Sequence, residues 1–116
     1  MTSEELAQAC AKYASDKQAT NIVALDLRGI STFTDFFVIC SGNSEPQLKA
    51  IAGGITEGLR TEHGEKPNAQ DGFPLSQWVV IDYGDVVVHI FHESKRDVYS
   101  LEDLWNDAPR LEVAVS

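Results

Sequence analysis

Residues 77–93 have the sequence QWVVIDYGDVVVHIFHE, which predicts two β-strands joined by a two-residue turn at Gly84-Asp85. Glycine at the first central position of such a loop fits a type II′ turn, whose twist matches that of the strands it joins. Because side chains alternate across a strand, the paired residues on either side of the turn sort into two faces. One is an apolar core face with the pairs Tyr83–Val86, Ile81–Val88 and Val79–Ile90.

The opposite face of this hairpin mixes aromatic, aliphatic and polar side chains. Its pairs are Trp78–Phe91, Val80–His89 and Asp82–Val87. This set is too polar for a core and too rich in aromatic rings for ordinary solvent-facing surface. We therefore expect this face to stay open and to carry the function.

A helix and two strands are predicted at the start of the chain. Thr2 and Glu5 form a capping box that begins a helix running to about Lys17. Residues 22–27 and 35–40 have the composition of strands. The second of these is apolar on both faces, which is typical of a central strand covered on both sides.

A second long helix is predicted to begin at Ser44, to run to about Glu62 and to stop at Gly64. Three glycines interrupt its outer face, each costing about 1 kcal/mol relative to alanine. They are Gly53, Gly54 and Gly58. Close approach of another backbone would account for them, but drift at exposed positions is the favoured interpretation.

A loop and a last helix complete the prediction. Residues 66–76 are rich in Pro, Gly, Asn and Asp and form a loop, in which Phe73 and Leu75 are expected to pack down. After the hairpin, Ser100 is the expected N-cap of a helix that Pro109 closes. The residues expected on its inner side are Leu101, Leu104 and Trp105.

This order of elements predicts an α/β fold, a mixed four- to five-stranded sheet with helices mainly on one face. The passage from strand 35–40 through a helix back into the sheet is long enough for a parallel pairing. The order resembles that of the nucleotidyltransferase fold. Residues 1–108 are expected to form a single domain, and residues 109–116 a C-terminal tail.

Charge and cysteine content restrict the class of protein. The 116 residues carry a formal net charge of -9, so the phosphates of nucleic acids repel the chain. Docking on a basic protein and mere solubility account for this charge equally well.

Cys10 and Cys40 lie in apolar contexts, which favours reduced, buried thiols in the cytoplasm. No signal peptide and no apolar run of about 18 residues is evident, so we expect a soluble cytoplasmic protein.

Catalytic and metal-binding patterns are weak. Residues 41–44, SGNS, lie between a strand and a helix, a position at which a loop can bind phosphate. Turns of this kind need the same residue types for structural reasons, and that interpretation is favoured. A nucleotidyltransferase would need two carboxylates one residue apart, and no Asp-x-Asp pair occurs. The three histidines make no ligand pattern with Cys or carboxylates. We therefore expect no enzyme activity, no metal and no cofactor.

Three motifs, in this order and spacing, resemble the ribosomal silencing factor (Iojap) family. The first is DFFVICSGNS at 35–44 followed by Gln47, and the second is WVVIDYGDVVVHIF at 78–91. The third comprises Arg96, Tyr99, Leu101-Glu102 and Leu104-Trp105. The resemblance extends from about Ile22 to Ala108, nearly the whole domain.

The resemblance implies a small α/β protein that is related in fold to nucleotidyltransferases but lacks their active site. It implies binding to the large ribosomal subunit through ribosomal protein fourteen, which blocks joining of the small subunit and represses translation under nutrient limitation. Alternatives are a role in large-subunit assembly, a residual nucleotide-binding enzyme, and a homodimer without a ribosomal role. The free protein can also self-associate through an exposed aromatic face.

We expect the mixed face of the hairpin to bind this partner. Trp78 and Phe91 are the candidate apolar anchors, with Val80 beside them. Asp82 and Asp85 would meet Lys or Arg of the basic partner. The partner-binding set is completed by His89, which would add a hydrogen bond, and by Tyr83. The alternative for Trp78 and Phe91 is burial under a helix, possible for any large aromatic side chain.

Overall fold

The computed structural model describes residues 1–72 and 77–113. Its elements are, in order, α1 Ser3–Asp16, β1 Thr20–Asp26, β2 Phe36–Gly42, α2 Glu45–His63, β3 Ala69–Asp71, β4 Trp78–Asp82, β5 Val86–His92, η2 Glu93–Lys95, α3 Arg96–Tyr99, α4 Leu101–Leu104 and β6 Arg110–Leu111. The expected packing of Phe73 and Leu75 lies outside the described residues.

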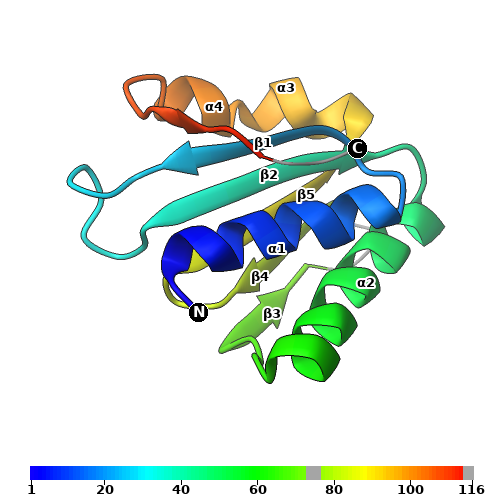
Figure 1. Ribbon diagram of the computed structural model, residues 1–116. Helices are drawn as coiled ribbons and strands as arrows, with labels where there is room; N and C mark the ends of the chain where they lie inside the picture. Colours follow the sequence, from blue (N-terminus) through cyan, green and yellow to red (C-terminus); the bar gives the residue numbers. More distant parts are fainter. Residues whose placement is uncertain (73–76, 114–116) are drawn as a thin grey trace.

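The strands form one mixed sheet in the order β3-β4-β5-β2-β1-β6 (Figure 1). Strands β2 and β5 are parallel, as the length of the intervening helical connection predicted, and the other neighbours are antiparallel. The α/β class and the mixed sheet are therefore confirmed, with six strands in place of four or five. The likeness to nucleotidyltransferases stays a prediction.

The predicted register of the hairpin is confirmed. Trp78 lies opposite Phe91 and Ile81 lies opposite Val88, and the remaining pairs follow the same alignment. The backbone N–H of Tyr83 donates to the carbonyl of Val86 at 2.8 Å, which closes the two-residue loop. Gly84 has φ +87, a conformation that L side chains rarely adopt and that glycine adopts without strain.

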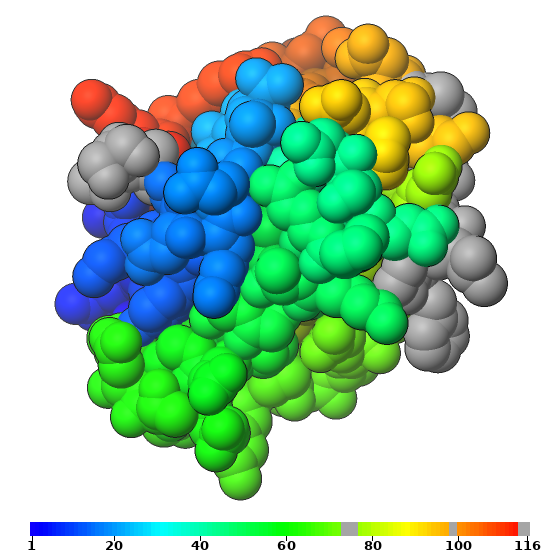
Figure 2. Space-filling view, turned by 90° about the vertical axis from the view of Figure 1, so that its right-hand side faces the viewer, coloured from blue at the N-terminus to red at the C-terminus, as the bar shows by residue number. Residues whose placement is uncertain are grey.

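The apolar face of the hairpin packs under the two long helices, α1 and α2. Val79, Ile81, Val88 and Ile90 are buried there in one cluster with Leu6, Cys10, Leu48, Ile51, Ile55 and Leu59. The two helices contact each other, and in Figure 2 the blue atoms of α1 lie beside the green atoms of α2. The main core of the protein therefore lies between this helix pair and the sheet.

Both long helices begin at the predicted caps. Thr2 accepts a hydrogen bond from the N–H of Glu5, whose carboxylate accepts from the N–H of Thr2. The hydroxyl of Ser44 accepts from the N–H of Gln47, and Gly64 ends α2 in the left-handed conformation. These bonds satisfy backbone groups that a helix end leaves unpaired, so local sequence determines where the helices begin.

The second face of the sheet is only partly open, which corrects the expectation for two residues. Phe91 is 1% exposed and His89 6% exposed. Phe91 belongs to a second buried cluster, against which Leu101 and Trp105 pack. The short helices α3 and α4 lie on the side of the sheet opposite α1 and α2 (Figure 1). This segment covers side chains that alternation alone assigned to an open surface.

The C-terminal helix differs from the prediction in two ways. Ser100 has φ 47 and makes no capping bond with α4, so the segment is divided into α3 and α4 instead of forming one helix. Leu104 is 72% exposed, so its assignment to the inner side is wrong. A helix of four residues has one turn, and residues at its end are not forced toward the sheet.

An ion pair fixes this C-terminal segment to the sheet. The guanidinium of Arg96 is buried and donates to the hydroxyl of Ser41 at 2.8 Å and to the carboxylate of Glu102 at 2.8 Å. Arg110 lies 3.9 Å from the same carboxylate. The adjacent guanidinium of Arg96 lowers the pKa of Glu102, so the carboxylate stays ionised near neutral pH.

Two short edge strands were not predicted. Strand β3 pairs with β4 inside the expected loop, and β6 pairs with β1 beyond residue 108. The N–H of Asp26 also donates to the carbonyl of Pro109 at 2.8 Å. The sheet therefore continues past the expected boundary between domain and tail.

Two of the three glycines of α2 make room for α1. A Cβ atom added to Gly58 would lie 2.6 Å from the ring of Tyr13, and one added to Gly54 would lie 2.8 Å from Lys17. The hydroxyl of Tyr13 donates to Glu62 at 2.7 Å, which holds the ring across the helix. Drift at exposed positions is therefore the wrong explanation for Gly58, whereas Gly53 has open space around it.

The cysteines are free and buried, as expected. Burial raises the pKa of Cys40 to about 12, and it also raises the pKa of Cys10. Both groups are therefore neutral thiols that pack as small apolar side chains. In the described part of the chain, no helix is long and apolar enough to cross a membrane.

The two glycines Gly58 and Gly53 provide a matched test of the helix contact. Gly58→Ala should lower the free energy of unfolding by about 1–3 kcal/mol, because the methyl group meets the ring of Tyr13. Gly53→Ala should raise it by about 0.5–1 kcal/mol, because alanine is the better helix former and the space is open. Urea denaturation of both variants measures the difference, and equal stabilisation by both would contradict the contact.

Burial of His89 predicts a stability that depends on pH. Burial lowers the pKa of His89 to about 4, below the value of about 6.5 in an unfolded chain. The unfolded state therefore binds the proton more tightly, so this contribution is complete above about pH 6.5 and is lost as pH falls toward 4. The loss amounts to about 3 kcal/mol.

Denaturation curves between about pH 7 and pH 4 check this pH dependence. In a His89→Phe variant the unfolding free energy should fall less steeply with acidification than in the wild type. The control is His63→Phe, which replaces an exposed histidine of α2 and should keep the wild-type slope. An unchanged slope in His89→Phe would show that another group titrates.

Candidate docking surface

Trp78 is the half-buried centre of the second face. Its ring stacks on Phe91 with centroids 5.1 Å apart, and its indole Nε1 donates to Nδ1 of His89 at 3.2 Å. The cross-strand register sets both contacts, since Phe91 lies opposite Trp78 and His89 follows diagonally. Trp78 therefore packs on the second core cluster through these two rings, and its side chain is half-buried.

His89 acts within the protein and cannot serve as a surface hydrogen-bonding group. Because Nδ1 accepts from Trp78, the neutral ring carries its proton on Nε2. This Nε2 is buried and has no hydrogen-bond partner among the described residues. The edge-on ring of Phe37, 4.6 Å away between centroids, packs against it. The expected hydrogen bond from His89 to a partner is therefore wrong for this structure.

The aromatic contacts continue from the hairpin across the neighbouring elements. Phe37 of β2 packs edge-on against Trp105 at 6.0 Å, and Phe33 lies 6.1 Å from Phe37 and 6.4 Å from Trp105. We call this continuous set the aromatic face, and its members are Phe33, Phe37, Trp78, His89, Phe91 and Trp105. It joins the hairpin, the central strand and the C-terminal segment.

Sequence reasoning missed the most exposed part of this surface. Phe33 is 62% exposed, and Leu104 is also exposed. Half-buried Val80 and Val87 add apolar area on the strands. Phe33 lies in the connection before β2 and follows no strand or helix periodicity, so its place beside Phe37 and Trp105 depends on the tertiary fold. Its isolated position as a large apolar residue in a polar loop was the available signal.

Tyr83 lies on the other face of the sheet from Trp78. It is buried with Val86 and Val88 under the long helices, which agrees with its strand register and excludes it from the docking surface. Burial raises the pKa of its hydroxyl, so the side chain is neutral. The inclusion of Tyr83 in the partner-binding set is therefore wrong.

An acidic tip adjoins the aromatic face, at the turn between β4 and β5. Its residues are Asp35, Asp82 and Asp85. Asp85 is exposed, and its carbonyl accepts from the N–H of Asp35 at 2.9 Å, which joins the turn to the start of β2. The carboxylate of Asp82 accepts from the N–H of Gly84 at 2.7 Å, so it also stabilises the turn. Asp85 is thus the carboxylate with the greatest freedom to meet a partner's cation.

Other chemistry finds little support in the described residues. Within them, no group of three His, Cys, Asp or Glu side chains converges where a metal ion could bind. In the segment 41–44, Ser41 binds Arg96 and Ser44 caps α2, so both hydroxyls have structural roles. This agrees with the structural interpretation of that turn.

Comparisons with known proteins identify the family. A family model described as ribosomal silencing factor during starvation matches residues 1–116. The ribosomal silencing factor RsfS of Halalkalibacterium halodurans is 45% identical over 113 residues, covering 97% of this chain and 96% of that protein. RsfS of Bacillus subtilis is 44% identical over 109 residues, covering 94% and 92%. The chloroplastic protein Iojap of Arabidopsis thaliana is 36% identical over 89% of this chain and 42% of its own length.

Solved structures share the fold. A crystal structure from Bacillus halodurans has 44% sequence identity and a TM-score of 0.80, covering 94% of this chain and 98% of that one. A crystal structure of a protein from Chromobacterium violaceum has 28% identity and a TM-score of 0.87, covering 100% and 95%. The match of the family model over the whole length, with relatives of 44–45% identity, shows that this chain belongs to the ribosomal silencing factor family.

Proposed function

We propose that this protein binds the large ribosomal subunit through ribosomal protein fourteen and blocks joining of the small subunit. Translation is thereby repressed when nutrients are limiting, in the cytoplasm. The observation that carries the proposal is the family match over residues 1–116. The surface that we assign to the contact consists of the acidic tip and the exposed or half-buried members of the aromatic face, which are Phe33, Trp78 and Trp105.

The chemistry of this surface supports a basic protein as partner. Exposed Phe33 and half-buried Trp78 and Trp105 supply rigid apolar area, the kind that dominates protein interfaces. Asp85, in the turn next to the start of β2, would attract cationic side chains and speed association. The net charge of -9 acts in the same direction over longer range.

The proposed mechanism is steric exclusion. A bound protein occupies space that the small subunit needs, so the complex only has to persist, and no catalytic group takes part. The ring contacts of the aromatic face hold Phe33 and Trp105 against Phe37 before binding. Less side-chain freedom is therefore lost on association, which favours a long-lived complex.

Co-sedimentation with purified large subunits tests the proposal, followed by addition of small subunits. We expect the protein to travel with the large subunit and to reduce the amount of joined ribosome in proportion to its occupancy. Failure to bind large subunits would overturn the proposed function. Binding without any effect on joining would overturn the blocking mechanism.

Phe33→Ala should weaken binding to the large subunit by about tenfold or more, the usual effect of removing an aromatic anchor. The free energy of unfolding should fall by only about 1 kcal/mol, because Phe33 is largely exposed and loses two ring contacts. His63→Ala, which removes an exposed ring on the helix side, is the control and should bind normally. Normal binding by Phe33→Ala would place the docking surface elsewhere.

Asp85→Lys should slow association several-fold at low salt, and the difference should shrink as salt is added. The screening length falls from about 30 Å at 0.01 M to about 8 Å at 0.15 M salt, which removes long-range attraction. Asp16→Lys makes the same charge change at the exposed end of α1 and should slow association much less. Equal effects of the two variants would mean that net charge, and not the acidic tip, steers binding.

A further inference from the structure

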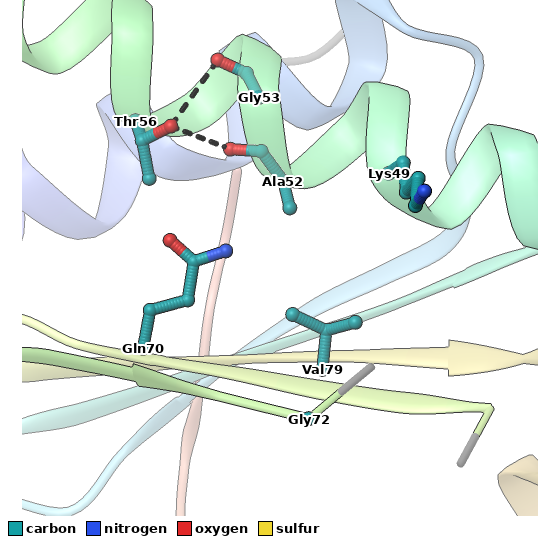
Figure 3. Close-up of a pocket in the computed structure, with 7 residues that line it drawn as sticks. All are labelled: Lys49, Ala52, Gly53, Thr56, Gln70, Gly72 and Val79. Atoms are coloured by element: carbon teal, nitrogen blue, oxygen red, sulfur yellow. Dashed lines mark hydrogen bonds between the residues drawn. The ribbon is translucent and has the colours of Figure 1, made fainter. Parts of the chain in front are cut away.

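A hollow lies between α2 and the edge of the sheet, on the side away from the aromatic face. Its volume is about 440 Å³, and the described residues that line it are Lys49, Ala52, Gly53, Thr56, Gln70, Gly72 and Val79. Figure 3 shows Gln70 and Val79 rising from the sheet toward α2. The hydroxyl of Thr56 is bonded to the carbonyls of Ala52 and Gly53, so it belongs to the helix wall.

A second hollow of about 330 Å³ shares Gly53 and Thr56 with the first, and its lining adds Arg60, Lys66 and Pro67. We call the two together the α2 groove. Because both hollows meet at Gly53, the absence of a side chain there keeps the groove continuous. A single ligand can therefore contact residues of both hollows. The volume of each hollow lies within the range of small-molecule sites.

The charge of this groove is opposite to that of the protein. Its lining carries three cationic side chains, Lys49, Arg60 and Lys66, and one carboxylate, Glu57. These are three of only nine Lys and Arg residues in a chain of net charge -9. None of the three forms an ion pair with any described residue. Unpaired cations gathered in a hollow favour a ligand with more than one negative charge.

The remaining lining groups indicate an organic portion of the ligand. Ala52 and Val79 provide apolar contact, and the amide of Gln70 can both donate and accept hydrogen bonds. Lys49 lies at the first hollow and Lys66 at the second, so the cations flank this apolar part. We propose that the α2 groove binds a small phosphorylated organic anion of nucleotide size, a ligand separate from the ribosomal partner.

This site is independent of the proposed docking surface. Val79 points to the helix side of β4, whereas Trp78 and Val80 point to the other side, because neighbours on a strand alternate. The ligand would therefore bind without touching the aromatic face. The proposal concerns ligand binding and not catalysis, since the described lining of the groove contains one carboxylate and no group placed to activate a nucleophile.

Calorimetric titration of the full chain at low ionic strength tests the proposal, with ATP, inorganic pyrophosphate and adenosine as probes. ATP should bind with a dissociation constant below about 1 mM, and adenosine at least about tenfold more weakly. Added salt should weaken ATP binding, because the cations are exposed. Absence of ATP binding overturns the proposal, whether or not a short single-stranded RNA binds under the same conditions.

Variants locate the binding in the groove. Arg60→Glu should weaken ATP binding at least about fivefold, whereas Lys12→Glu, the same change on the exposed face of α1, should change it less than about twofold. Gly53→Leu should fill the junction of the hollows and abolish binding while the thermal midpoint stays equal or rises, because the Cβ meets no atom within 4 Å and leucine is a better helix former than glycine. Equal losses in Arg60→Glu and Lys12→Glu, or full ATP binding by Gly53→Leu, would overturn the assignment.

Discussion

Strand β2 must be covered on both of its faces, because all seven of its residues are buried. Phe36, Val38 and Cys40 point into the main core under α1 and α2, whereas Phe37 and Ile39 belong to the second cluster. The two long helices cover only the first face. The chain must therefore return over the second face, and the segment after β5 does so. Much of the architecture follows from this requirement.

The cover on the second face is short, and its shortness leaves part of the surface that we propose for docking uncovered. Helices α3 and α4 have four residues each and are fixed by Arg96, which joins Ser41 to Glu102. Because the guanidinium of Arg96 is buried, loss of its partners would leave an uncompensated charge, so these bonds hold in place a segment that has little apolar area of its own. The segment of α3 and α4 shields Phe91 but leaves Trp78 half-buried. The same cover thus completes the core and sets the limit of the exposed aromatic rings.

Local patterns predicted the parts of the fold that depend on neighbouring residues. The alternation in residues 77–93 determined the hairpin register, and the helix caps at Thr2 and Ser44 lie where expected. Alternation predicts which side chains lie on the same face of a strand, but it does not predict what covers that face. The sequence therefore predicts Phe91 at the surface, whereas the C-terminal segment covers it. Strands β3 and β6 have three and two residues, too few for any periodicity. The contact of Gly58 with Tyr13 joins residues far apart in sequence, and no local pattern encodes it.

The candidate site shows the same division between local and tertiary information. Trp78 and Asp85 could be selected from the hairpin alone, whereas Phe33 enters the surface only through Phe37 and Trp105. Because these rings pack on one another and on His89, the proposed docking surface is an outward extension of the second core cluster. A surface built in this way is ordered before a partner arrives, so binding does not have to offset the entropy of arranging it. Residues that we propose to bind the partner and residues that stabilise the fold are therefore separable only at the rim, where Phe33 and Asp85 make few contacts within the fold.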